Sequence, residues 1–177
     1  EDVVEEVVSQ NGVLMIPSFA LERTQELLYH FNDLVENSRI PKVPIFMDSP
    51  LAIQITNIYK KYESYFNKEA NSLIKSGDDL FNFSGLQFTE SVEQSKKINK
   101  LPSPKVIIAG SGMSHGGRIL HHEALYLPVS NNIILLISYQ AHGTLGRQIQ
   151  DGATKVRILD KEILVRAKVA KLSGYSA

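Results

Sequence analysis

The sequence predicts an α/β domain of three layers, in which helices cover both faces of a mostly parallel sheet. Short apolar runs alternate along the 177 residues with helical patterns, which is typical of parallel strands joined by crossover helices. The runs are continuous in apolar residues, as expected for strands buried on both faces. Near the C-terminus the apolar period changes to two, which predicts an antiparallel hairpin after a Rossmann-like sheet.

The first two strand–helix units are predicted from their turns and caps. Residues 13–16 form an apolar strand, and Ser18 is the expected N-cap of the helix that follows. Residues 45–47 form the next strand, where Ser49 and Pro50 supply an N-cap and a first-turn proline. A polar helical stretch then continues before the middle of the chain.

The second half of the chain continues the alternation. After a short strand at 86–88, Ser91 and Gln94 form a capping box for a short helix. The strand 105–109 runs into a glycine-rich turn, and a helix is expected over 116–126. The predicted elements that follow are the apolar strand 133–138 and the helix 143–149.

The last part of the chain is expected to form a hairpin with one apolar face. The strand at 156–159 turns at residues 160 and 161 and returns along a strand with alternating apolar residues. That face contains Ile163, Val165, Ala167 and Val169. Because monomers rarely expose large apolar patches, we expect it to pack on a domain outside this chain. We therefore assign residues 1–154 to the main domain and residues 155–177 to the hairpin.

Composition excludes several classes of protein. Nineteen basic and nineteen acidic residues cancel, which argues against nucleic-acid binding by bulk charge but allows a local basic groove. Without cysteine there is neither a disulfide nor a thiolate metal site, which favours a cytoplasmic setting. No apolar run is long enough to cross a membrane. Both ends look cut, so we expect a fragment of a longer protein.

A ligand site is expected at the carboxyl ends of the parallel strands. Four strand ends carry polar or glycine-rich loops, at Ser18, at 48–49, at 110–113 and at 139–143. Glycines let a ligand approach the backbone, and amides at a helix start favour an anion. The same glycines also serve a plain strand-to-helix turn, so the anion site and the structural turn both stay open.

The five histidines do not form a metal-binding motif. None has the spacing of a His-x-His or His-Glu-x-x-His pair, so no metal ligand is assigned. His121 and His122 are adjacent on a helix and are expected to be surface residues. His115 and His142 lie in the strand-end loops and are the better candidates for ligand contact.

Six segments together carry a resemblance to a known family, and they are residues 17–28, 45–52, 110–113, 116–120, 138–146 and 173–177. In this order they resemble the β-CASP domain of metallo-β-lactamase-fold nucleases that process RNA, especially the bacterial and archaeal relatives of the pre-mRNA 3′-end endonuclease. The resemblance covers nearly the whole chain. In this family the β-CASP domain closes over a lactamase-fold domain, whose two zinc ions activate the water that attacks an RNA phosphodiester.

The resemblance implies roles for individual residues. The acidic signature residue of the family maps onto Glu26, which is expected to hydrogen-bond a histidine that protonates the leaving oxygen. That histidine and the zinc motif are absent from this sequence, so the chain alone is expected to bind no zinc and to cleave nothing. The residues expected to contact RNA are Ser18, Arg23, Ser49, Ser111, Gly112, Met113, Arg118 and His142.

Two other functions remain open at this stage. One is the same domain from a DNA-cutting relative, and the other is a non-catalytic subunit that binds RNA or serves assembly. The expected partners are RNA and the lactamase-fold domain of the same polypeptide, which is expected to bind the zinc. No association with a membrane is expected. A homodimer, and the choice between endonuclease and 5′ exonuclease, also stay open.

Overall fold

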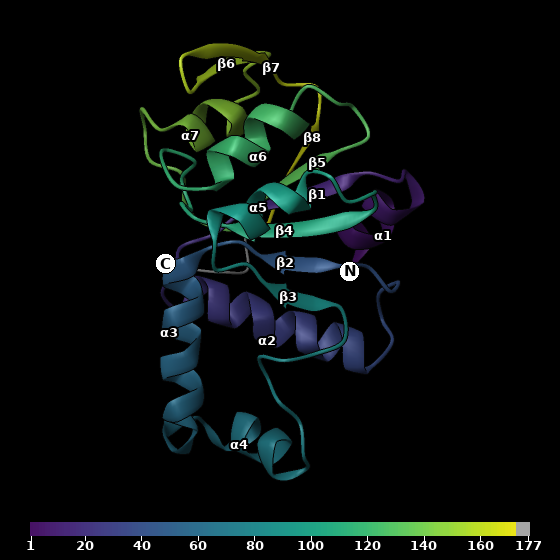
Figure 1. Cartoon of the computed structure of the whole chain (residues 1–177), viewed down its shortest axis with the longest axis vertical. Coiled ribbons are helices and arrows are strands. Elements are labelled where there is room, and N and C mark those ends of the chain that lie inside the picture. The colour runs from purple at the N-terminus through teal and green to yellow at the C-terminus, as the bar shows by residue number, and fades with distance from the viewer. Residues whose placement is uncertain (173–177) are drawn as a thin grey trace.

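The structure, a computed structural model, describes residues 1–172. The strands of its main sheet are β1 (Val13–Pro17), β2 (Ile45–Met47), β3 (Leu86–Phe88), β4 (Lys105–Ala109), β5 (Ile133–Leu136) and β8 (Lys168–Lys171). Within this part of the chain they form one parallel sheet in the order β3-β2-β4-β1-β5-β8 (Figure 1). The predicted fold class is confirmed.

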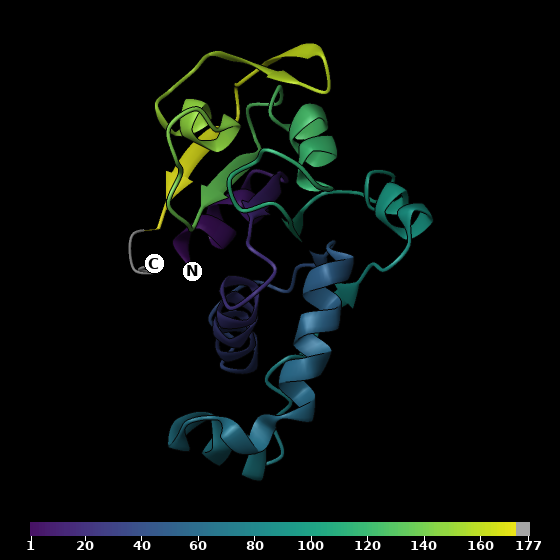
Figure 2. The ribbon, with the colours of Figure 1, turned by 90° about the vertical axis from the view of Figure 1, so that its left-hand side faces the viewer.

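Helices cover both faces of this sheet. They are α1 (Asp2–Ser9), α2 (Arg23–Glu36), α3 (Pro50–Lys61), α4 (Lys68–Lys75), α5 (Val92–Ile98), α6 (Ile119–Tyr126) and α7 (Leu145–Gln150), with a 3-10 turn at Glu63–Tyr65. One core contains buried residues of α1, α2 and α3, and the other contains those of α5, α6 and α7. Figure 2 shows that α3 carries the chain away from the sheet to α4.

The two cores follow from the alternation of side chains along each strand. In β1, Leu14 and Ile16 belong to the first core, whereas Val13 and Met15 belong to the second. All four are fully buried, as the continuous apolar pattern predicts. Full burial of each such side chain contributes about 1.5–3 kcal/mol, so the central strands anchor the loops at their ends.

Two of the three predicted helix caps are confirmed. Ser49 accepts a hydrogen bond from the Ala52 amide, and Ser91 forms the capping box with Gln94. The N-cap role of Ser18 is wrong, because α2 begins only at Arg23. The chain makes an extra turn first, in which the Phe19 carbonyl accepts both the amide and the hydroxyl hydrogen of Thr24.

The hairpin is shorter than predicted. It joins β6 (Lys155–Ile158) to β7 (Lys161–Leu164) in antiparallel register. Val169 is not part of it, because it lies in β8, which pairs in parallel with the edge strand β5. The amides of Arg166 and Ala167 both donate to the Leu127 carbonyl and fix the crossing from hairpin to sheet.

The apolar face of the hairpin is covered by the chain itself, which corrects the expectation that it needs another domain. Val156 and Ile158 are buried in the second core, and Ile163 and Val165 pack against that core. Helices α6 and α7 both contact β6. Docking of residues 155–177 on a lactamase-fold domain therefore stays a prediction, without this face as its argument.

Two further observations concern the C-terminal segment and membrane association. The matching segment at 173–177 lies outside the described residues. Within residues 1–172, no helix is both long enough and apolar enough to cross a membrane.

Candidate functional site at the carboxyl edge of the sheet

The strand-end loops meet at one edge of the sheet, as predicted. The Ser18 amide donates to the Ala109 carbonyl at 3.0 Å, which extends the β1–β4 ladder beyond the strand end. A Cβ placed on Gly110 would lie 3.6 Å from Ser49 Oγ and 3.7 Å from the Ser18 carbonyl oxygen. Three of the four predicted loops thus touch around Gly110.

The fourth loop closes on the glycine turn from the other side. Gln140 Nε2 donates to the Gly112 carbonyl at 2.9 Å, and the Gly146 amide donates to the Met113 carbonyl at 3.1 Å. A Cβ on Gly146 would lie only 1.9 Å from Oε1 of the buried Gln140, so a larger residue there would have to displace this side chain. The 110–113 and 138–146 segments therefore form one packed unit.

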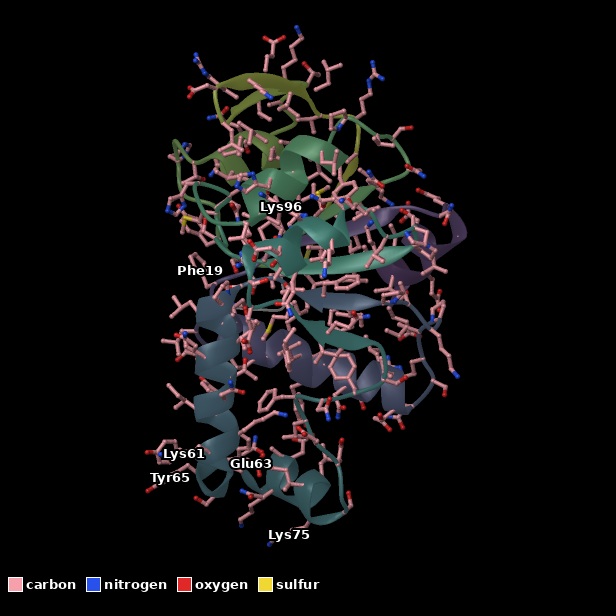
Figure 3. The ribbon with its side chains drawn as sticks, viewed as in Figure 1. Phe19, Lys61, Glu63, Tyr65, Lys75 and Lys96 are labelled. Carbon is pink, nitrogen blue, oxygen red and sulfur yellow. The ribbon has the colours of Figure 1, made fainter. Side chains whose placement is uncertain are left out.

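Gly112 is required by its packing against Phe19. A Cβ at this position would lie 2.8 Å from the Phe19 ring and 2.9 Å from the Phe19 amide nitrogen. Figure 3 shows Phe19 at the end of α3 that meets the sheet. The structural reading of this glycine is thus supported, and the RNA-binding reading remains a prediction.

The loop 110–118 is held by hydrogen bonds within itself, and its last residues are not part of the helix α6 that follows. The Ser111 amide donates to the Gly116 carbonyl at 3.1 Å, and Ser111 Oγ accepts from the His115 amide at 3.2 Å. These bonds explain why α6 starts at Ile119 and not at residue 116. Within the described chain, the amides of Gly112 and Met113 donate to no other residue.

Asp48 is the most densely bonded side chain at this edge. It directly follows β2 and is completely buried. Oδ1 accepts from Thr89 Oγ1 at 2.6 Å and from Arg118 Nη1 at 2.7 Å. Oδ2 accepts from Ser95 Oγ at 2.5 Å and lies 2.7 Å from His122 Nε2. One carboxylate thus connects the end of β2 with α5, α6 and the end of the glycine loop.

The electrostatics of Asp48 follow from competing effects. Burial by itself would raise the pKa of this carboxyl, because the charged form loses water. The hydrogen bonds from His122, Ser95, Thr89 and Arg118 outweigh burial and lower the pKa to about 2. Asp48 is therefore ionised at neutral pH and acts as a fixed acceptor.

Two residues of this network differ from their expected roles. His122 is 1% exposed and bonded to Asp48, so its assignment as a surface histidine is wrong. Arg118, expected to contact RNA, donates to Asp48 and to the carbonyls of Thr89 and Glu90. Its guanidinium is thus engaged within the fold, and an RNA contact remains a prediction. Sequence periodicity could not find these pairs, because their partners lie up to 74 positions away.

The remaining predicted residues are divided between buried and exposed positions. Ser18 is 1% exposed, and its hydroxyl lies 2.9 Å from Thr24 Oγ1, so its side chain supports the α2 turn. His142 is exposed in the 138–144 loop. Arg23 Nη1 donates to Glu26 Oε2 at 2.8 Å in the first turn of α2.

Glu26 faces a groove away from the glycine loop. The groove lies among α2, α3 and α4 and has a volume of about 370 Å³. Its walls are aromatic and acidic, with Tyr59 and Phe66 opposite Glu22 and Glu26. The Glu26 carboxylate is 44% exposed at this position, so a histidine from another segment can reach it.

The described residues do not fit a zinc site. Across residues 1–172, no three His, Asp or Glu side chains come close enough together to hold a metal ion. The donors at the carboxyl edge are instead used in pairs such as Asp48 with His122.

A parallel sheet with a glycine loop and a buried polar network at its carboxyl edge has the arrangement in which open α/β sheets place their ligand sites. The β-CASP domain model, described as "Beta-Casp domain", matches residues 24–149. This match covers more than half of the chain, which therefore belongs to the β-CASP family. The matched segment includes Glu26, Asp48, Arg118 and His122.

Curated relatives agree with this family. Ribonuclease TTHA0252 of Thermus thermophilus is 39% identical over 99% of this chain and 40% of its own length. Transcription termination factor FttA of Methanosarcina mazei is 31% identical, over 98% of this chain and 28% of its own length. The RNase J-like protein of Methanocaldococcus jannaschii is 31% identical, over 96% and 38%. The chain thus spans well under half the length of these relatives.

Proposed function

We propose that this chain is the substrate-guiding β-CASP domain of a zinc-dependent ribonuclease that hydrolyses RNA phosphodiesters. The observation that carries the proposal is the 39% identity to a named ribonuclease across almost the whole chain. A second relative is named RNase J-like, which favours RNA over DNA as the substrate. The proposed parent is a cytoplasmic protein whose lactamase-fold domain would hold the zinc.

The carboxyl edge supports the guiding role. The amides of Gly112 and Met113 are not used within the described chain, and backbone amides are good ligands for phosphate oxygens. The bond from Gln140 Nε2 to the Gly112 carbonyl orients the Met113 amide, which lies in the same peptide plane. The bond from the Ser114 amide to the Ser111 carbonyl orients the Gly112 amide in the same way. Ser49, Ser111 and Met113 are only half-buried, so we propose that the RNA path crosses these side chains.

Glu26 has a different proposed role. Its partly exposed carboxylate would accept a hydrogen bond from a histidine of the longer protein and orient it to protonate the leaving oxygen. Arg23, at 2.8 Å, holds the carboxylate in position on α2. Within this chain, Glu26 therefore orients a proton donor and is not itself a zinc ligand.

The test is RNA cleavage by the full-length parent with a 5′-labelled single-stranded RNA and a DNA oligonucleotide of the same sequence. Cleavage of RNA that stops on chelation and returns with zinc supports the proposal. Cleavage of DNA alone would favour a DNA-cutting relative. RNA binding without any cleavage would favour a non-catalytic subunit.

A further inference from the structure

The buried carboxyl of Glu123 lies beneath the glycine loop and bonds directly to it. Glu123 is on α6 and is 0% exposed. Its Oε1 accepts a hydrogen bond from Ser114 Oγ at 2.5 Å. Ser114 is also 0% exposed and has a φ of 55°, so the backbone at this position has the left-handed conformation. Non-glycine residues seldom adopt that conformation without local support.

This carboxyl is expensive to keep in the interior. Burial raises the pKa of Glu123 to about 8, and the hydrogen bond from Ser114 only partly offsets the rise. Its Oε2 has no hydrogen-bond partner among the described residues. An apolar side chain would fill the same space without that cost. Packing alone therefore does not account for a glutamate here.

The neighbouring residue holds the other end of the same loop. His122 Nε2 lies 2.7 Å from Asp48 Oδ2, and Asp48 Oδ1 accepts from Arg118, the last residue of the loop. Consecutive residues on a helix point about 100° apart, so His122 and Glu123 reach different partners. Helix α6 is thus bonded to the middle of the loop 110–118 directly, through Glu123 and Ser114. It is linked to the end of the loop through Asp48, which contacts both His122 and Arg118.

The bond to Ser114 bears on the amides that precede it. The Ser114 amide donates to the Ser111 carbonyl at 3.1 Å, which closes a tight turn over Gly112 and Met113. If the Ser114 side chain is released, the turn loses its only side-chain tie to α6 within the described chain. The Gly112 amide shares a peptide plane with the Ser111 carbonyl, so its direction would be less firmly fixed. The Met113 amide would then be oriented only through the bond from Gln140 to the Gly112 carbonyl.

We propose that Glu123 is a positioning residue that fixes Ser114 and thereby aims the amides of Gly112 and Met113 at an RNA phosphate. The proposal rests on the proposed function of the carboxyl edge. It predicts that the hydrogen bond to Ser114, and not the charge or bulk of Glu123, is what RNA binding needs.

The experiment compares Ser114→Ala, Glu123→Leu and Glu123→Gln in the full-length parent, with His121→Gln as control. His121 precedes the pair on the same helix and is exposed. Three quantities are measured: the Kd for a fluorescein-labelled 15-nucleotide RNA, hydrogen exchange of residues 111–117, and the melting temperature. Glu123→Gln keeps an oxygen that accepts from Ser114, so it should restore what Glu123→Leu removes.

We expect Ser114→Ala and Glu123→Leu to speed exchange in the loop and to weaken RNA binding about tenfold, the loss of roughly one hydrogen-bonded contact. Glu123→Gln and His121→Gln should match wild type in both measurements. Unchanged exchange and Kd in Ser114→Ala, which is small enough to fold, would overturn the proposal. Equal weakening by Gln and Leu at position 123 would do so too.

Loop exchange separates this proposal from the proposed function. If the wild-type parent does not bind RNA at all, the proposed function fails. The hydrogen-exchange result then still decides whether Glu123 positions the loop.

Discussion

Asp48→Asn should destabilise the domain more than any equally conservative change at its surface. The substitution keeps the shape of the side chain but replaces a carboxylate oxygen that accepts two hydrogen bonds by an amide that donates. Whichever way the amide turns, it faces two of the donors Thr89, Ser95, Arg118 and His122. The Arg118 guanidinium, 18% exposed, also loses its counter-ion.

Two lines of reasoning give the magnitude. Removing one partner of a buried ion pair costs about 3–5 kcal/mol, and the partial exposure of Arg118 places the effect at the lower end. Independently, a pKa of about 2 against an ordinary value of 3.8 corresponds to roughly 2 kcal/mol at neutral pH. The expected loss is therefore about 2–3 kcal/mol.

The pH dependence has a definite sign. The pKa of Asp48 is lower in the folded than in the unfolded chain, so its stabilising effect is present above about pH 4 and is lost as the pH falls toward 2. The difference between wild type and Asp48→Asn should narrow by about 1 kcal/mol between pH 7 and pH 3.

The assay is urea denaturation followed by circular dichroism, because the chain contains no tryptophan. Asp151→Asn is the matched control, since Asp151 pairs with Arg147 at the surface and should cost at most about 0.5 kcal/mol. If the two variants lose the same stability at pH 7, Asp48 is not the centre of the network and the reasoning is refuted.

Three further predictions follow from other parts of the molecule. Gly112→Val should weaken RNA binding by the parent, because its Cβ would displace Phe19; a folded variant that binds as tightly as wild type would leave this turn with a structural role only. The pKa of Glu123 is raised in the folded chain, so the free energy of unfolding should fall as the pH rises from about 4.5 to 8, and Glu123→Gln should not show this fall. At pH 9 the variant should be more stable than wild type by about 3–5 kcal/mol in urea denaturation. Parallel pH profiles of the two proteins would contradict the burial argument. The chain alone should bind no zinc stoichiometrically, and metal analysis that finds two zinc ions per purified chain would refute this.

Much of the fold could be predicted from local patterns. Continuous apolar runs identified the four inner strands of the sheet, β2, β4, β1 and β5. Ser49 and Ser91 marked helix starts correctly because capping is a short-range interaction. The N-cap prediction for Ser18 was wrong because the Phe19 carbonyl accepts the hydrogen bonds of the Thr24 amide and hydroxyl in an extra turn before α2. No spacing rule predicts this turn. The strand β8 was missed because it adds to a sheet edge formed more than thirty residues earlier.

The location of the candidate site could be predicted from the sequence, but the hydrogen bonds among its side chains could not. Parallel strands bring their carboxyl ends to one edge, so the meeting of Ser18, Ser49 and Gly110 followed from the fold. The pairing of Asp48 with His122 depends on how α6 packs across the loop, which is a long-range property. A histidine next to a buried glutamate gave no periodic signal of its own.

The most direct test of the proposed function is single-turnover cleavage of a 5′-labelled RNA by the full-length parent with Glu26→Gln. Glu36→Gln, an exposed change at the other end of α2, is the control. We predict that wild type and the control cleave at the same rate and that Glu26→Gln is about 10²–10⁴-fold slower with an unchanged melting temperature. Equal rates for all three proteins, or no RNA cleavage by wild type, would contradict the account.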